Sequence, residues 1–401
     1  MKSLKELYKI GRGPSSSHTM GPQLASKIFL EKYPFAHSYE VTLYGSLAAT
    51  GKGHMTDVAI IDVLGVNHKL EIVWKPKIFL PFHPNGMEFK AFGKHQELLG
   101  SWVVYSVGGG ALSEGKVGDD LFDTPDVYDL NTMKEIMKWC ETNGRSFWEY
   151  VDMCEDDDIW DYLMECWNVM KAAVERGINS EGVLPGVLNL RRKAPSYYVK
   201  ATGYKTSLQT RGLVYAYALA VSEENASGGT IVTAPTCGAC GVMPAVLYHL
   251  SKGHEFSDIR ILHAMATAGL FGNTVKHNAS ISGADVGCQG EVGVACAMVS
   301  AAACQLFGGS NEQIEYAAEM GLEHHLGMTC DPVCGLVQIP CIERNAFAAT
   351  RALDANLYSS FSDGKHRVSF DKVVRVMKRT GHDLPSLYKE TSEGGLAAEK
   401  F

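Results

Sequence analysis

A change in hydrophobic pattern near residue 110 constrains the fold of this chain more than any other feature of its sequence. Before it, strand-like segments such as YEVTLYGS, HKLEIVW and SWVVYSV follow the helical spacing of LASKIFLEKY, and Gly, Pro or Asn separate them. After residue 131, strand signals become rare, and Ala-rich runs such as GVACAMVSAAACQLF indicate buried helices. The pattern predicts an α+β protein with a small N-terminal α/β domain over 1–115, a linker and helical connection over 116–180, and a mainly α-helical domain over 181–401.

Charge and hydropathy exclude two classes of partner. The 401 residues are 46% hydrophobic and carry a formal net charge of −8, and the longest basic run is the RRK at 191–193. Nucleic-acid binding is therefore not expected. The segment MKSLKELYKIGRG lacks the apolar core of a signal peptide, and no stretch approaches the roughly 20 apolar residues of a membrane span. We expect a cytoplasmic protein with no membrane partner.

Three of the eleven cysteines lie in loops suited to metal ligation. Cys288 in GADVGCQGE, Cys330 in GMTCDPVCG and Cys341 in QIPCIERN have Gly or Pro neighbours, which let a backbone bend around a large inorganic group. Pro340 also predicts that Cys341 begins a helix, where the helix dipole would lower the pKa of its thiol. By spacing alone, Cys237 and Cys240 with Cys330 and Cys334 form a competing four-thiolate zinc set.

The stretch GPSSSHTMGP gathers hydroxyl groups directly before a predicted helix. Pro22 favours the first turn of that helix, so nearby hydroxyl and amide groups would face a positive helix end. The segment is equally consistent with a carboxylate-binding loop and with N-capping side chains of structural use only. The hydroxyl-bearing residues of the loop are Ser15, Ser16, Ser17 and Thr19.

Two histidines lie among these loop residues. His18 is inside the serine-rich stretch, and His54 is in GKGHMTD. Imidazole is the side chain whose unperturbed pKa lies nearest neutrality, so both are candidates to accept a proton. The residues by themselves do not order the roles of these two histidines.

These motifs resemble one family over nearly the entire chain. The segments GPSSSHTMGP, YGSLAATGKGHMTD, ENASGGTIVTAPTCGACGVMPAV, NASISGADVGCQGEVGVACAM, EHHLGMTCDPVCGLVQIPCIERNA and ETSEGGLA are similar, in order, to the iron–sulfur-dependent L-serine dehydratases. The resemblance implies a [4Fe–4S] cluster bound by Cys288, Cys330 and Cys341, an amino-acid substrate and a homodimer. It also implies that the N-terminal domain contributes substrate-binding loops. Both histidines match active-site positions of the family, so we expect His54 to be the Cα base and His18 to bind substrate or transfer a proton.

The resemblance adds weaker substrate contacts to this set. Arg344 follows Cys341 and could bind a substrate carboxylate through its planar guanidinium, or form a structural ion pair. The other substrate contacts that the resemblance implies are Asn85, Ser280 and Ser282. Departures from the family pattern place Cys237 and Cys334 where relatives often carry Asn and Ala.

The implied reaction removes water and then ammonia from L-serine to give pyruvate. Three ligands for four irons would leave one iron open as a Lewis acid for the substrate hydroxyl, and a neutral imidazole would take the Cα proton. The alternatives are a related lyase acting on threonine or cysteine and a zinc- or cluster-bearing module that senses amino acids without turnover. The first of these depends on pocket shape, which no motif reveals.

Overall fold

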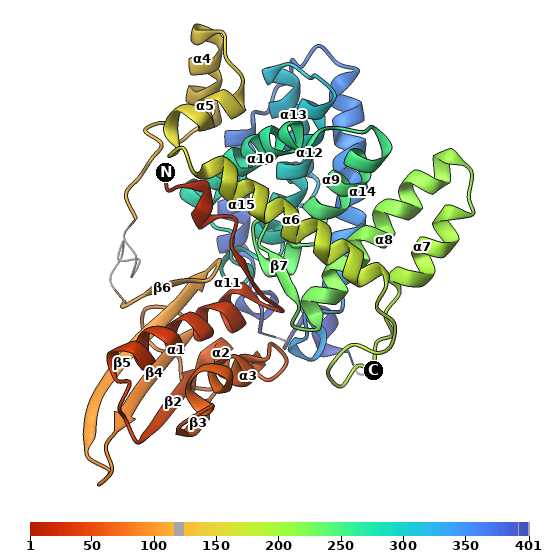
Figure 1. Ribbon diagram of the computed structural model, residues 1–401. Coiled ribbons are helices and arrows are strands. Elements are labelled where there is room, and N and C mark those ends of the chain that lie inside the picture. The colour runs from red at the N-terminus through yellow and green to blue at the C-terminus, as the bar shows by residue number, and fades with distance from the viewer. Residues whose placement is uncertain (116–123, 392, 400–401) are drawn as a thin grey trace.

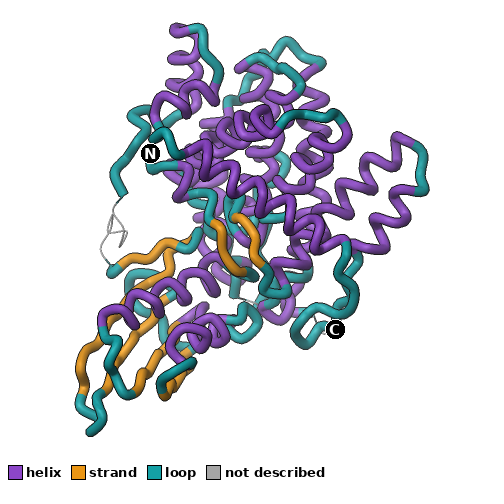
Figure 2. The backbone as a smooth tube through the Cα atoms, in the orientation of Figure 1, coloured by secondary structure: helices purple, strands orange, loops and turns teal. Residues whose placement is uncertain are grey.

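A computed structural model describes residues 1–115, 124–391 and 393–399 of the chain. It contains a small sheet domain and a larger helical domain, which meet near the serine-rich loop (Figures 1 and 2). The α+β class predicted from the sequence is therefore confirmed. Within the described residues, no helix combines the length and the apolar character needed to cross a bilayer.

The sheet domain is a five-stranded mixed sheet covered by short helices. The strand order is β3-β2-β4-β5-β6, in which only β2 and β3 are parallel. Buried side chains of α1, α2 and α3 pack with alternate residues of the strands to form a separate core, which includes Phe29, Leu47, Val41 and Phe89. The bounds are α1 (Gly21–Lys32), β2 (Ser38–Tyr44), α2 (Gly45–Thr50), α3 (Thr56–Ile60), β3 (Lys69–Lys75), β4 (Gly86–Phe92), β5 (Leu98–Gly108) and β6 (Ala111–Ser113).

The helical domain is built around long buried helices. Its central helix, α12, carries VACAMVSAAACQL, and the small side chains let the neighbouring helices approach closely. The bounds are α4 (Met133–Asn143), α5 (Phe147–Cys154), α6 (Ile159–Ile178), α7 (Ala194–Thr202), α8 (Thr206–Ala226), α9 (Val242–Gly253), α10 (Asp258–Asn278), α11 (Gly283–Val286), α12 (Val294–Leu306), α13 (Asn311–Glu323), α14 (Cys341–Ser360) and α15 (Phe370–Asp383).

The two domains do not simply follow one another along the chain, because the N-terminal residues belong to the helical domain. Leu4, Leu7 and Tyr8 are buried in the helical core, and β1 (Ile10–Arg12) pairs with β7 (Thr230–Val232). The sheet domain is thus an excursion from a helical domain that begins at the N-terminus. Within 116–180, α4, α5 and α6 also contribute to that helical core, with Trp167 fully buried, while residues 116–123 of the expected linker lie outside the described residues.

Junction residues hold the serine-rich loop against both domains. The Asn225 side chain, at the end of α8, donates from Nδ2 to the carbonyl oxygen of Pro14 at 2.9 Å. On the other side, a Cβ at Gly21 would lie 2.3 Å from the Ser106 Oγ of β5, so only glycine lets α1 begin this close to the sheet. The loop is therefore held where the two domains meet.

Candidate active site

Three buried cysteines from separate elements line one small cavity at the domain junction. Cys288 precedes a π-helical turn (Gln289–Gly293), Cys330 lies in the loop after α13, and Cys341 begins α14. Among the described residues, a single group of three or more Cys, His, Asp or Glu side chains has ligand atoms within 4.8 Å of one another, and it comprises Cys288, Glu291 and Cys330. The structure thus brings together the cysteines that the resemblance selected.

The electrostatics of these thiols suit a positively charged group. A hydrogen bond with Cys288 and burial raise the pKa of the Cys330 thiol well above its ordinary value. Burial and the nearby Cys288 raise the pKa of Cys341 in the same direction. Closely spaced thiolates repel one another in a site that excludes water, and a bound metal removes that penalty. The expected lowering of the Cys341 pKa by the helix dipole is wrong in this structure because burial and the neighbouring sulfur outweigh it.

The competing four-thiolate zinc set is contradicted by the structure. Cys237 and Cys240 are both buried and do not line the cavity that contains Cys330, and the thiol of Cys237 lies 3.5 Å from the thioether sulfur of Met20. Cys334 is exposed and does not line the cavity that contains Cys330. Spacing along the chain suggested four zinc ligands, but the fold places these four cysteines in different surroundings.

The serine-rich loop forms a π-helical turn, η2 (Ser16–Met20), that continues directly into α1. The Ser15 hydroxyl accepts from the backbone N–H of His18 at 3.1 Å. The Thr19 hydroxyl donates to the backbone oxygen of His54 at 2.6 Å, and the Thr56 hydroxyl donates to that of His18 at 2.5 Å. These hydrogen bonds join the two sheet-domain loops that carry His18 and His54. Among the hydroxyl-bearing residues of the serine-rich loop, only Ser15 lines the cysteine cavity.

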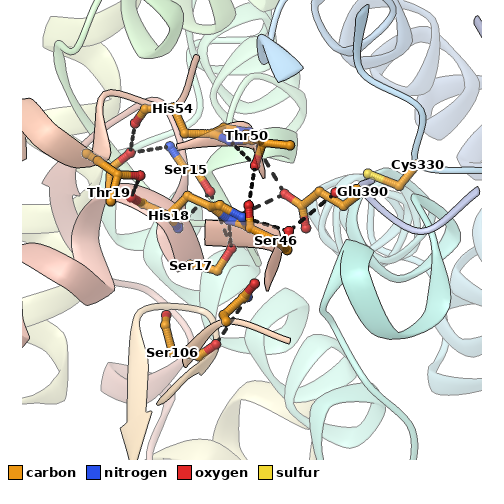
Figure 3. A network of polar contacts seen from close by, with 12 residues as sticks. Ser15, Ser17, His18, Thr19, Ser46, Thr50, His54, Ser106, Cys330 and Glu390 are labelled. Carbon is orange, nitrogen blue, oxygen red and sulfur yellow. Dashed lines mark hydrogen bonds and ion pairs between the residues drawn. The ribbon is translucent and has the colours of Figure 1, made fainter. Parts of the chain in front are cut away.

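The two histidines predicted to act in proton transfer lie side by side (Figure 3). Their ring centroids are 4.5 Å apart, and both side chains are fully buried. The Nδ1 and Nε2 atoms of His18 lie 2.8 Å from Ser17 Oγ and 3.0 Å from Ser46 Oγ. The Nδ1 of His54 lies 3.1 Å from Thr50 Oγ1, whereas its Nε2 has no hydrogen-bond partner among the described residues.

Burial keeps both imidazoles neutral. It lowers the pKa of His54 to about 4, and burial together with His54 lowers the pKa of His18 well below 6.5. A neutral imidazole at neutral pH is able to accept a proton. His54 also lines the cysteine cavity, so its unpartnered Nε2 is the free basic atom that the site offers.

Two buried carboxyl groups complete the cavity and were not singled out from the sequence. Glu291 Oε1 accepts from the Thr236 hydroxyl at 2.8 Å, and Oε2 lies 3.8 Å from the sulfur of Cys288. Glu390 comes from the C-terminal tail and lies 3.7 Å from His18 Nδ1 and 4.0 Å from His54 Nε2. Burial raises the pKa of Glu390 to about 8. Both lie in motifs that carry the family resemblance: Glu291 ends GCQGE, and Glu390 is the first residue of ETSEGGLA.

The remaining predicted contacts lie around the cavity rather than on its lining. Arg344 is paired with Asp331 at 3.1 Å and donates to the Thr329 carbonyl at 2.6 Å, so it forms the structural ion pair that the sequence left open. Asn85 donates from Nδ2 to the Ser106 carbonyl at 3.2 Å, and its Oδ1 has no partner in the part of the chain that the structure describes. Ser282 precedes α11, and its backbone N–H donates to Ser280 Oγ at 3.2 Å.

Comparison with known proteins gives the family of this chain. Residues 88–397 match the family model for the serine dehydratase alpha chain, and residues 3–69 match that for the serine dehydratase beta chain. In this chain the helical domain carries the three cysteines of the cavity, and the sheet domain contributes the loops that carry His18 and His54. The chain belongs to the serine dehydratase family, with the alpha and beta parts joined in one polypeptide.

Curated relatives agree over the full length. The chain is 41% identical to an L-serine dehydratase of Streptomyces coelicolor, with 98% of each chain covered. It is also 41% identical to the L-serine dehydratase TdcG of Escherichia coli, with 99% of each covered, and 37% identical to an L-serine dehydratase of Helicobacter pylori, with 98% of each covered.

Proposed function

We propose that this protein is an L-serine dehydratase that converts L-serine to pyruvate and ammonia. The names of its relatives support this activity. The observation that carries the proposal is the unpartnered Nε2 of His54, which belongs to a residue lining the same small cavity as Cys288, Cys330 and Cys341. A base and a set of soft metal ligands at one buried site are what an elimination from serine requires.

The three cysteines fit a [4Fe–4S] cluster. Thiolates are the usual ligands of such clusters, and these three are buried and come from separate loops. A Cβ at Gly283 would lie 3.0 Å from Cys330 Sγ and 2.6 Å from Glu291 Oε2, so glycine keeps space open beside the sulfur. When bound, the cluster would supply a Lewis-acidic iron that weakens the bond from carbon to the substrate hydroxyl.

The chain's own residues would bind serine and remove its proton. His54 Nε2 would take the Cα proton, while its Nδ1–H donates to Thr50 Oγ1 at 3.1 Å and holds the ring in place. Ser15, at the start of the η2 turn, would help to bind the substrate carboxylate, and His18 would assist proton transfer beside His54. Loss of the β-hydroxyl gives aminoacrylate, which tautomerises to an imine that water hydrolyses to pyruvate and ammonia.

The other proposed contacts would act from around this cavity. Ser16, Ser17 and Thr19 would shape the carboxylate-binding loop, and Asn85 would support substrate from the sheet domain. Ser280 and Ser282 would support it from the loop between α10 and α11. Arg344 would hold the Cys330 loop through Asp331 rather than bind substrate directly. A homodimer and the preference for serine over threonine or cysteine stay predictions of the family resemblance. A cytoplasmic location stays a prediction from the sequence pattern.

Metal analysis and a turnover assay test this function. Protein purified without oxygen should contain about four iron and about four acid-labile sulfide per chain, and should release pyruvate from L-serine under anaerobic conditions. The same protein stripped of iron by a chelator is the matched control and should be inactive. Zinc without sulfide, or a full iron–sulfur complement without pyruvate release, would reject the proposal.

The depressed pKa of His54 sets the acid limit of activity. The neutral base is lost only as the pH falls through about 4, so kcat/KM should not show a protonation step near pH 6.5, where an exposed histidine titrates. Brief exposure to each pH, followed by assay on return to pH 7, separates reversible protonation from acid damage to the iron–sulfur centre. A reversible decline centred near pH 6.5 would contradict His54 as a buried neutral base.

A further inference from the structure

The C-terminal tail places one carboxylate inside the active site. Glu390 follows a short helical turn (Ser386–Tyr388), and its backbone N–H donates to the Cys330 carbonyl at 2.8 Å. In the opposite sense, the Cys330 N–H donates to the Tyr388 carbonyl at 2.8 Å. The tail thus pairs with the loop of one proposed metal ligand, as a short parallel bridge.

The backbone of Glu390 adopts an unusual conformation to direct its side chain inward. Its φ is 58°, in the left-handed region that residues other than glycine rarely occupy. The Ser46 hydroxyl of α2 also donates to the Glu390 carbonyl at 3.4 Å. Only 10% of the side chain is exposed, and Figure 3 shows the carboxyl group directed from the helical domain toward His18 and Ser46 of the sheet domain. The fold holds this carboxyl group in a defined position.

Glu390 faces no lysine or arginine in the part of the chain that the structure describes. Its ion-pairing distances are to His18 and His54, and both imidazoles are neutral because they are buried. Arg344, which follows Cys341 on α14, is paired with Asp331 at 3.1 Å. A buried carboxyl group without a cation favours its neutral form, and a positively charged group that enters beside it favours the carboxylate.

L-Serine supplies such a group. The amino acid carries a carboxylate, a β-hydroxyl and an α-ammonium group. In the proposed function the hydroxyl faces the three cysteines and the carboxylate faces the serine-rich loop. The ammonium group then requires a partner, and Glu390 lies on the cavity lining together with His54 and the three cysteines. Charge-assisted hydrogen bonds from ammonium to carboxylate are among the stronger polar contacts in proteins.

We propose that Glu390 binds the α-ammonium group of the substrate and thereby selects α-amino acids over hydroxy acids of the same shape. This proposal rests on the proposed dehydratase function. It makes the C-terminal tail a part of the substrate site, in addition to the sheet-domain loops. The contact also fixes the direction of the Cα–H bond relative to His54. When the ammonium group, the carboxylate and the β-hydroxyl are all held, the Cα hydrogen can point in only one direction.

A pair of ligands that differ only in the ammonium group tests this assignment. L-Serine and 3-hydroxypropionate share the carboxylate and the β-hydroxyl, but the second lacks the amine. In anaerobic holoenzyme, Glu390→Gln should raise the KM for L-serine about 30-fold or more, the effect of removing one partner from a buried charge pair. The Kd of 3-hydroxypropionate, measured by calorimetry and as a competitive inhibition constant, should stay within about twofold.

Two further variants separate ammonium binding from a structural role. Glu393→Gln makes the same chemical change at an exposed residue of the same tail and should leave both constants unchanged. Glu390→Asp keeps the charge and should recover part of the lost serine affinity. Equal weakening of both ligands by Glu390→Gln, or no weakening of either, would overturn the proposal. Failure of the unchanged holoenzyme to release pyruvate would instead reject the dehydratase function itself.

Discussion

Cys330→Ala should remove both the iron–sulfur centre and serine turnover. Cys330 Sγ lies beside Cys288 and Glu291 in a buried group whose ligand atoms are within 4.8 Å of one another, and two remaining thiolates do not hold a four-iron cluster. We expect iron and sulfide contents to fall close to zero and kcat to fall to below about a thousandth of its original value. Iron and sulfide analysis, the visible absorbance of the cluster and an anaerobic pyruvate assay measure these losses.

Cys334→Ala is the matched control for this variant. Cys334 lies four positions further along the same loop but is exposed and does not line the cavity. Its replacement should leave the iron content and turnover close to those of the unchanged protein. If Cys334→Ala lost the metal while Cys330→Ala retained it, the three-cysteine assignment would be wrong. Circular dichroism of both variants establishes that each is folded before the comparison is made.

His54→Gln should lower kcat about 10²- to 10⁴-fold while the iron–sulfur centre remains. The side chain lines the cavity, and its Nε2 has no partner within the described residues, so its removal takes away the proposed proton acceptor and no metal ligand. The expected result is full iron and sulfide content, an unchanged visible spectrum and little pyruvate. Exchange of the Cα hydrogen of L-serine with deuterated water should slow in parallel.

Two other histidine variants serve as comparisons for His54→Gln. His68→Gln alters a residue away from the cavity, where Nδ1 lies 3.0 Å from the Ala36 carbonyl oxygen, and should leave kcat unchanged. His18→Gln should reduce turnover less than His54→Gln because both ring nitrogens of His18 already contact Ser17 and Ser46. If His18→Gln lost more of kcat than His54→Gln, and His54→Gln still exchanged the Cα hydrogen, then His18 rather than His54 would be the base.

Local signals in the sequence mark where helices begin. Cys341 begins α14 directly after Pro340, as the sequence predicts, and Ser310 and Gln313 form a capping box at the start of α13. These features depend on contacts between residues a few positions apart, which the sequence displays directly.

The choice among cysteines required the tertiary structure. Spacing along the chain allowed Cys237, Cys240, Cys330 and Cys334 as well as the family set, and it gave no measure of burial or of distances between separate loops. The fold buries Cys288 and Cys330 side by side and leaves Cys334 exposed. Family resemblance selected the same three residues, but geometry supplies the physical reason, which is the convergence of three buried loops at one cavity.

The sequence by itself determined the α+β class, the helical second part and the loops that carry the candidate residues, because these follow from hydrophobic period and from Gly and Pro positions. The tertiary structure alone decided that Glu390 reaches the histidines. Ser46 and Glu390 are separated by 344 positions in the chain yet share a hydrogen bond. Contacts of that separation depend on how two domains and a terminal tail pack together, and no local pattern in the sequence encodes the distance between them.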